Sequence, residues 1–202
     1  MSTADDFDLG PKYEGLHSGD NARWDDLRFP VQAINPPGQA SDPDVEASTG
    51  MLLFDAGGTE LVYGVAQLPH SWLEESTVRP HIHWQKTVAN SPTGNVLWRL
   101  EYELVNNGSV AAMDYGTALD VTAPVAGTPD DGSADRVLIS SFGDVSMRGQ
   151  SISSLIFWKL SRIGGDASDT YASDARLIEI DFHYIVDGLG SLEQFTKQDW
   201  GK

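Results

Sequence analysis

Hydrophobic and polar residues alternate along several stretches of the chain, and this period of two predicts β-strands. The stretch 78–85 shows it most clearly, with Val78, Pro80, Ile82 and Trp84 on one side and Arg79, His81, His83 and Gln85 on the other. A strand here has one apolar face and one face with two histidines beside an arginine. Pro80 has no N–H to donate, which places it at a strand start, a bulge or a sheet edge.

Two later stretches alternate as clearly. Residues 96–105 place Val96, Trp98, Leu100, Tyr102 and Leu104 on one side and Arg99, Glu101 and Glu103 on the other. Residues 176–186 place Ile178, Ile180, Phe182, Tyr184 and Val186 on one side and Glu179, Asp181 and His183 on the other. Both stretches are therefore predicted to be strands with one apolar face and one face of titratable groups.

Further strand signals are shorter or weaker, and they lie at 24–35, 51–55, 59–68, 117–122, 134–143 and 151–163. The tight-turn sequence Ala56-Gly57-Gly58 predicts a hairpin between 51–55 and 59–68. Residues 151–163 are apolar on both faces, which favours a doubly buried strand over a helix. No stretch shows a convincing amphipathic helix. The sequence thus predicts an all-β, antiparallel β-sandwich, a jelly roll of the TNF-like or viral type.

The length of 202 residues suits one all-β domain with flanking segments. We expect an N-terminal arm at 1–23, a jelly-roll domain at 24–191 and a C-terminal tail at 192–202. The arm is polar and acidic and is broken by glycine and proline. It is either an extended arm that lies on a neighbouring subunit or an unstructured end.

Charge and composition argue against several classes of function. Thirteen Lys and Arg against thirty Asp and Glu give a net charge of −17, which disfavours nucleic acid and anionic membranes as partners. The chain has no cysteine, so disulfides and thiolate chemistry are excluded. The N-terminus does not have the pattern of a signal peptide, and no apolar run approaches the length of a membrane span. We therefore expect synthesis in the cytoplasm without Sec-dependent export.

The candidate functional residues are the titratable groups on the polar faces of three predicted strands: Arg79, His81, His83, Arg99, Glu101, Glu103, Glu179, Asp181 and His183. One interpretation is a solvated outer sheet face with cross-strand charge pairs. A second is a contact surface between subunits. A third is a metal or catalytic site.

The metal interpretation depends on His81-x-His83, which places two imidazoles on one strand face about 7 Å apart along the backbone. Zinc and non-haem iron sites use two or three histidines and a carboxylate. His183 is the first candidate for a further ligand, and the others are His70, Glu101 and Asp181. Cupin jelly rolls follow His-x-His with a glutamate, whereas the sequence WQKT follows His83 here. We therefore predict no metal or cofactor, and a cupin-like metal-dependent enzyme using His81, His83 and His183 stays an alternative.

Other enzyme signatures are weak or missing. The sequence has no Gly-x-Ser-x-Gly elbow and no P-loop lysine, and a paired-carboxylate glycosidase is supported only by the presence of acids. Trp72, Trp84, Trp98 and Trp158 are candidates for stacking on sugars. The last three lie on predicted strands and are expected in the core, which leaves Trp72 as the exposed candidate.

Several segments, taken together and in order, resemble a family of tailed-phage and prophage virion proteins. They are WDDLRFPVQA (24–33), LLFDAGGTELVYGVAQLPHSW (52–72), RPHIHWQKT (79–87), NVLWRLEYEL (95–104), SSFGDVSMRGQSISSLIFWKLSRI (140–163) and DTYASDARLIEIDFHYIVDGLGS (169–191). The pair LPHSW–PHIHW and the ending DFHY–D–GS are the most specific. The resemblance implies a structural protein of the particle, a jelly-roll subunit that assembles as a trimer, and it carries no catalytic residue.

The expected function is therefore a non-enzymatic component of the virion, a homotrimeric jelly roll that decorates or attaches to the capsid as a head decoration or head-spike protein. Its partners would be copies of itself and other virion proteins. A tail or baseplate component, or a module that binds a glycan of the host surface, is the alternative. Contacts between copies would use the face with histidines, arginine and acids.

Overall fold

The structure is a computed structural model of the whole chain, and it describes residues 23–34, 36–89, 94–112, 114–125, 134–187, 190–194 and 196–197. The predicted N-terminal arm lies outside these residues except for Arg23, and so does the end of the predicted tail from 198 onward. Among the described residues, no helix is long and apolar enough to cross a lipid bilayer.

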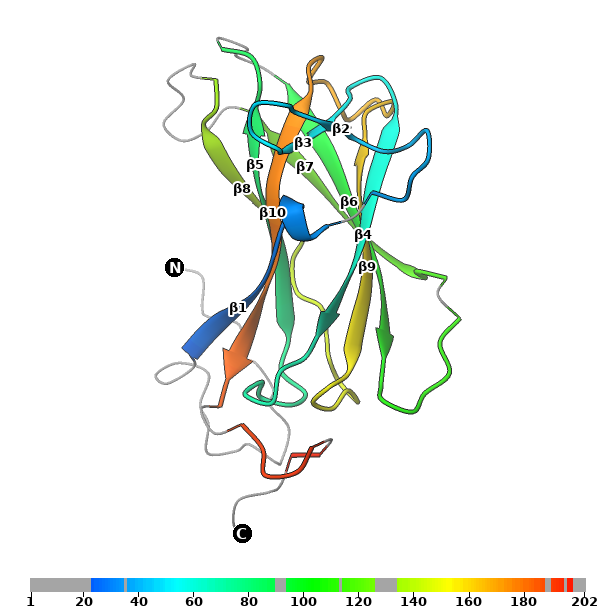
Figure 1. Cartoon of the computed structure of the whole chain (residues 1–202), viewed down its shortest axis with the longest axis vertical. Helices are drawn as coiled ribbons and strands as arrows, with labels where there is room; N and C mark the ends of the chain where they lie inside the picture. Colours follow the sequence, from blue (N-terminus) through cyan, green and yellow to red (C-terminus); the bar gives the residue numbers. More distant parts are fainter. Residues whose placement is uncertain are drawn as a thin grey trace, which may run out of the picture.

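The protein is all-β, with two antiparallel sheets packed face to face as a sandwich (Figure 1). The elements are β1 (Arg23–Pro30), a 3₁₀ turn (Val31–Ala33), β2 (Asp44–Val45), β3 (Leu52–Phe54), β4 (Thr59–Gln67), β5 (Val78–Lys86), β6 (Asn95–Val105), β7 (Thr117–Pro124), β8 (Val137–Ser141), β9 (Leu155–Ile163) and β10 (Ala175–Val186). Sheet A has the order β2-β3-β10-β5-β8, with β1 also paired to β10, and sheet B has the order β4-β9-β6-β7. From β3 to β10 the chain crosses between the sheets at every step except from β6 to β7, which pair with each other in sheet B. This is the strand order of a jelly roll, which confirms the predicted fold class.

The hairpin predicted around Ala56-Gly57-Gly58 is wrong. Strand β3 pairs with β10 in sheet A, whereas β4 pairs with β9 in sheet B. The turn therefore carries the chain from one sheet to the other. A turn sequence indicates that the chain reverses direction, but it does not indicate which strand the next segment pairs with.

Several predicted boundaries also shift. The stretch 24–35 divides into β1 and the 3₁₀ turn, and the two-residue strand β2 lies between the stretches predicted as strands. The stretch 151–163 forms a strand, β9, as predicted in preference to a helix. Its inward residues Ile156, Trp158 and Leu160 are almost completely buried, and Leu155 and Phe157 on its outer face are partly buried.

A β-bulge in β10 changes the predicted alternation. The pairing with β5 shifts between Leu177 and Glu179, so Ile178 is the extra residue. Leu177 is fully buried in the core, whereas Ile178 is only partly buried. The prediction that Ile178 shares the core face is therefore wrong, and beyond the bulge the core face continues with Ile180 and Phe182 as predicted.

Pro80 lies within β5, a central strand, where its lack of an N–H would normally weaken a ladder. Its carbonyl oxygen accepts a hydrogen bond from the backbone N–H of Phe142, just beyond the last residue of β8. In an antiparallel ladder the N–H and C=O of one residue point to the same neighbour. Pro80 therefore lacks its N–H at a position opposite Phe142, where the ladder between β5 and β8 has already ended.

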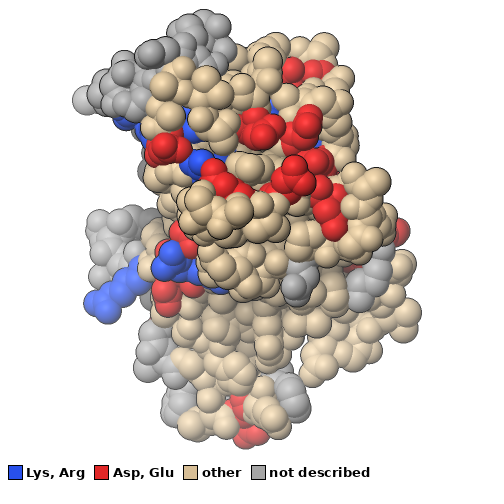
Figure 2. Space-filling view, turned by 45° about the horizontal axis from the view of Figure 1, so that its top comes forward, with Lys and Arg blue, Asp and Glu red and all other residues tan. Residues whose placement is uncertain are grey.

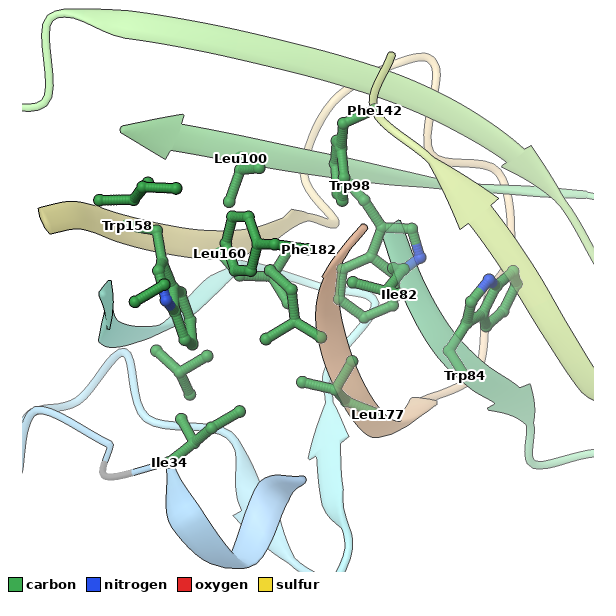
Figure 3. Packing of buried hydrophobic residues seen from close by; sticks show 14 of the residues in the cluster. Ile34, Ile82, Trp84, Trp98, Leu100, Phe142, Trp158, Leu160, Leu177 and Phe182 are labelled. Carbon is green, nitrogen blue, oxygen red and sulfur yellow. The ribbon is translucent and has the colours of Figure 1, made fainter. Parts of the chain in front are cut away.

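The core lies between the two sheets and is rich in aromatic side chains (Figure 3). Trp84 and Phe182 enter it from sheet A, and Trp98 and Trp158 enter it from sheet B. Trp84 and Trp98 pack edge to face with ring centroids 6.0 Å apart. Trp72 is also fully buried, so the prediction of an exposed, sugar-stacking Trp72 is wrong.

Candidate functional site

The outer face of sheet A gathers most of the candidate residues on the neighbouring strands β5 and β10. In the antiparallel register His81 lies opposite Asp181, His83 opposite Glu179, and Arg79 opposite His183. Because side chains opposite each other on one face are close, the sequence patterns of the two strands combine into one polar surface. The structure therefore brings together six of the nine candidates.

The other three candidates lie on the opposite side of the molecule. Arg99, Glu101 and Glu103 are on β6, on the outer face of sheet B. Arg99 pairs with Asp120 at 2.7 Å, and Glu101 pairs with Lys159 at 2.6 Å. The expectation of one shared polar face is therefore wrong, because β5 and β6 follow each other in sequence but belong to different sheets.

Strands β1 and β8 complete the surface on sheet A. It forms a hollow of about 450 Å³ lined by Asp26, Arg28, Arg79, His81, His83, Ile139, Ser141, Glu179, Asp181 and His183. The sequence analysis missed Asp26, Arg28, Ile139 and Ser141. No local pattern marks them, because they reach the hollow only through the pairing of β1 with β10 and of β8 with β5.

Three ligand-type atoms converge at the floor of the hollow. His81 Nε2 lies 3.1 Å from His83 Nε2. Asp181 Oδ2 lies 3.5 Å from His81 Nε2 and 3.4 Å from His83 Nε2. Although they are on an outer face, the side chains of His81 and Asp181 are only 8% and 4% exposed, and that of His83 is 24% exposed. We name His81, His83 and Asp181 the His-Asp cluster.

His183 is next to this cluster but does not belong to the converging set. Its Nε2 lies 2.8 Å from Asp26 Oδ1, and its ring packs on the ring of His81 with centroids 4.2 Å apart. The alternative ligand set of His81, His83 and His183 is therefore replaced in the structure by one with Asp181. Of the other candidate ligands, His70 contacts Ser191 and is not among the residues that line the hollow.

Burial changes the acid–base behaviour of the cluster. Removal from water, helped by the nearby charge of Glu179, raises the pKa of Asp181 to about 7. Removal from water also lowers the pKa of His81, and repulsion from His183 and His83 adds to this effect. Burial therefore favours the uncharged form of both Asp181 and His81.

The surrounding cations are engaged elsewhere. Arg28 pairs with Glu179, with Nη2 and Oε2 2.6 Å apart, and Arg79 pairs with Asp144 at 2.7 Å. The guanidinium of Arg79 also lies 4.8 Å from the ring centroid of Trp24, an aromatic side chain that is 42% exposed. Neither arginine forms its ion pair with Asp181, so they frame the hollow without neutralising the carboxylate at its floor.

A second hollow, of about 440 Å³, lies at one end of the sandwich and is lined by Asp55, Ala56, Gly57, Asp169, Thr170, Tyr171, Ala172 and Asp174. Figure 2 shows acidic side chains gathered over an end of the molecule. Asp44, Asp55 and Asp174 each add to the raised pKa of Glu60 through repulsion, although burial is its main cause. The acidic side chains at this end of the sandwich therefore repel one another.

Comparison with known proteins adds little to this geometry. No protein-family model matches the chain, and no curated protein matches it. Among solved structures, the chain is similar to one described as Xyl-CBM35 in complex with a glucuronic acid containing disaccharide, at 16% identity and a TM-score of 0.38, over 79% of this chain and 99% of that one. This similarity is too weak to carry an argument, and the jelly roll is assigned from the strand order.

Proposed function

We propose that this chain is a non-enzymatic structural subunit of a phage-like particle, a jelly roll that assembles as a homotrimer and decorates or attaches to the capsid. It acts as a head decoration or head-spike protein, with other virion proteins as partners and the virion as its location. The number three comes from the family resemblance alone. A place in the tail or baseplate is the alternative within the same class.

One observation carries the proposal. The two most specific segments of the resemblance, PHIHW and DFHY, are distant in sequence, yet they lie side by side on β5 and β10 with His81 opposite Asp181. Their polar residues form one continuous surface on sheet A. The segments on which the resemblance rests therefore contribute to one surface, and this supports the proposal.

A surface for contact between copies lies beside the hollow. Strand β8 is the last strand of sheet A, and within the described residues its ladder is to β5 alone. Its outward side chains Val137 and Ile139 are 52% and 64% exposed. An edge strand with exposed apolar side chains is a ready place for another chain to pair or pack. We assign this edge to a second copy of the subunit.

Light scattering coupled to size-exclusion chromatography tests the assembly. We expect a mass three times the 21.9 kDa of one chain. The variant Val137→Lys/Ile139→Lys should reduce the mass to that of one chain. Burial of two charges at the contact would cost more free energy than the contact provides. Val110→Lys is the matched control, since Val110 is 100% exposed on a loop. A wild-type chain that runs as a monomer at micromolar concentration would contradict the assembly.

Particle analysis tests the location. We expect mass spectrometry of density-purified particles from the host of this chain to find it in a fixed ratio to the major capsid protein. Gold-labelled antibody against the chain should then mark the head surface. Labelling at the tail would move the protein to the alternative position, and absence of the chain from pure particles would overturn the proposal.

Binding of a host-surface glycan is the second candidate, and Trp24 is the observation that favours it. Its ring is 42% exposed and lies beside the polar hollow, with the Arg79 guanidinium 4.8 Å from its centroid. A sugar would stack on the exposed part of the ring while carboxylates such as Asp26 accept hydrogen bonds. Glycan-array binding that is lost in Trp24→Ala and kept in Val110→Ala would support this role. An array without specific binding would remove it.

A further inference from the structure

We propose that His81, His83 and Asp181 form a binding site for one divalent transition-metal ion of the zinc type. The site is a function in addition to the assembly proposed above and does not depend on it.

The spacing of the three ligand atoms fits a tetrahedral ion. The separations among His81 Nε2, His83 Nε2 and Asp181 Oδ2 are 3.1, 3.4 and 3.5 Å. Bonds of about 2.0–2.1 Å at tetrahedral angles place neighbouring ligand atoms about 3.3 Å apart. The mean spacing of the three atoms is therefore that of neighbouring ligands in a tetrahedral zinc site.

The ligand set has the right chemistry. Two imidazole nitrogens and one carboxylate oxygen are three of the ligand types that zinc binds in proteins. Both histidines present Nε2, so each ring would hold its proton on Nδ1, which in His81 is buried without a hydrogen-bond partner among the described residues. His81 and His83 are two residues apart on one strand, which makes their rings point the same way from a rigid backbone.

The carboxylate of the cluster is poorly paired within the protein. The carboxylate of Asp181 is almost completely buried, its Oδ1 has no hydrogen-bond partner among the described residues, and its contacts to the two imidazoles are long for hydrogen bonds. Burial of a carboxylate without compensation is costly. Arg28, which lies opposite Asp181 on β1, directs its guanidinium to Glu179 instead. An ion at the centre of the three atoms would supply the missing positive charge.

His183 is placed to support the site rather than to bind the ion. Its Nε2 is turned to Asp26 Oδ1 at 2.8 Å, while its ring packs on that of His81. It therefore fixes the orientation of one ligand ring, as outer-shell residues commonly do. It is also a useful control, because it is a histidine in the same hollow that we exclude from the ligand set.

Three protein ligands leave a fourth tetrahedral position open. Zinc sites with three protein ligands keep water or a substrate group in that position. Here it faces the hollow of about 450 Å³, rimmed by Arg28 and Arg79. A water molecule or a small anion fits this position because the ion is positive, while Arg28 and Arg79 are already paired with Glu179 and Asp144.

Isothermal titration calorimetry tests the site. The full-length chain, prepared without a histidine tag and stripped with a chelator, is titrated with ZnCl₂ in a buffer that does not bind metal. We expect one ion per chain. His83→Ala should weaken binding by more than the roughly 10–100-fold typical of an outer-shell loss. His183→Ala should stay within that range. Circular dichroism and the unfolding midpoint confirm that each variant is folded.

Spectroscopy and oligomeric state complete the test. Cobalt substitution should give the intense visible absorption of a tetrahedral Co²⁺ site, and this absorption should be lost in His83→Ala and in Asp181→Asn. Failure to bind stoichiometric Zn²⁺, or binding that is unchanged in His81→Ala/His83→Ala, would overturn the inference. Light scattering with and without chelator separates the two proposals. A metal-binding monomer would support the site and contradict the trimer, whereas a trimer that binds no metal would do the reverse.

Discussion

Arg162 on β9 and Asp169 in the loop that follows form an ion pair inside the protein, with two contacts of 2.8 and 2.9 Å. Their side chains are 0% and 1% exposed. The same guanidinium donates hydrogen bonds to the backbone oxygens of Phe54, Tyr171 and Ser173. One side chain therefore connects β3 in sheet A, β9 in sheet B and the loop that leads into β10.

Replacement of Arg162 by methionine should lower the free energy of unfolding by about 3–5 kcal/mol, because the buried carboxylate of Asp169 loses its counter-ion and keeps only the hydrogen bond from the backbone N–H of Leu97. Urea unfolding at pH 7 measures it. Arg99→Met is the matched control, since Arg99 and Asp120 pair at 2.7 Å with side chains 38% and 42% exposed. That exposed pair should contribute less than about 1 kcal/mol. Equal losses in the two variants would contradict the assignment of Arg162 as a structural connector.

Gly64 on β4 lies directly opposite Trp158 on β9, and the indole occupies the space of a side chain. A Cβ atom at Gly64 would lie 2.0 Å from Trp158 Cζ2. Gly64→Ala should therefore destabilise the protein by at least about 1–3 kcal/mol, the cost of forcing atoms into a packed core. Gly165→Ala is the control, because a Cβ there meets nothing within 4 Å. Thermal unfolding of the two variants checks the difference, and an unchanged midpoint for Gly64→Ala would contradict it.

The fold was predictable from the sequence to the extent that its strands have one apolar face. Strands β5, β6 and β10 alternate because each lies between the core and the outside, so their positions and their core residues could be read directly. Pairing could not be read, because β3 and β4 separate into different sheets across a turn that looks like a hairpin. The bulge at Ile178 also has no local sequence signal, since it is set by the match with β5.

The site was predictable in part for the same reason. The pattern placed His81 and His83 together, and it offered Asp181 among several possible partners. Which partner completes the cluster depends on the register of β5 and β10, which places Asp181 opposite His81. The contribution of β1, with Asp26 and Arg28, depends on a long-range pairing that no local pattern encodes.

The hydroxyl of Tyr171 holds the backbone after β5. The side chain is 1% exposed, and its oxygen accepts hydrogen bonds from the N–H groups of Thr87 and Val88 at 3.1 and 3.3 Å. Tyr171→Phe leaves both N–H groups without this acceptor, which should cost about 1–3 kcal/mol. Hydrogen exchange at these two amides should become faster. Tyr63→Phe, at a partly buried position on β4, is the control and should leave both amides protected.

Asp174, at the acidic end of the sandwich, should make stability depend on pH. Burial raises its pKa above the ordinary value, the charge of Asp55 adds to this, and Arg162 offsets part of it. In the folded protein Asp174 therefore keeps its proton to a higher pH than in the unfolded chain. Stability from this group is present below the ordinary pKa and is lost as pH rises through the raised pKa.

Asp174→Asn should accordingly stabilise the protein at pH 7, where the wild-type carboxylate is charged against its surroundings. The gain should be below about 1 kcal/mol, since the group is only partly buried, and it should shrink as pH falls toward the ordinary pKa. Urea unfolding at pH 7 and pH 4.5 measures both parts of the prediction. Glu75→Gln removes an exposed carboxylate and should change stability little at either pH. If Asp174→Asn destabilises the protein at pH 7, the folded surroundings favour the charged carboxylate of Asp174 and the prediction is wrong.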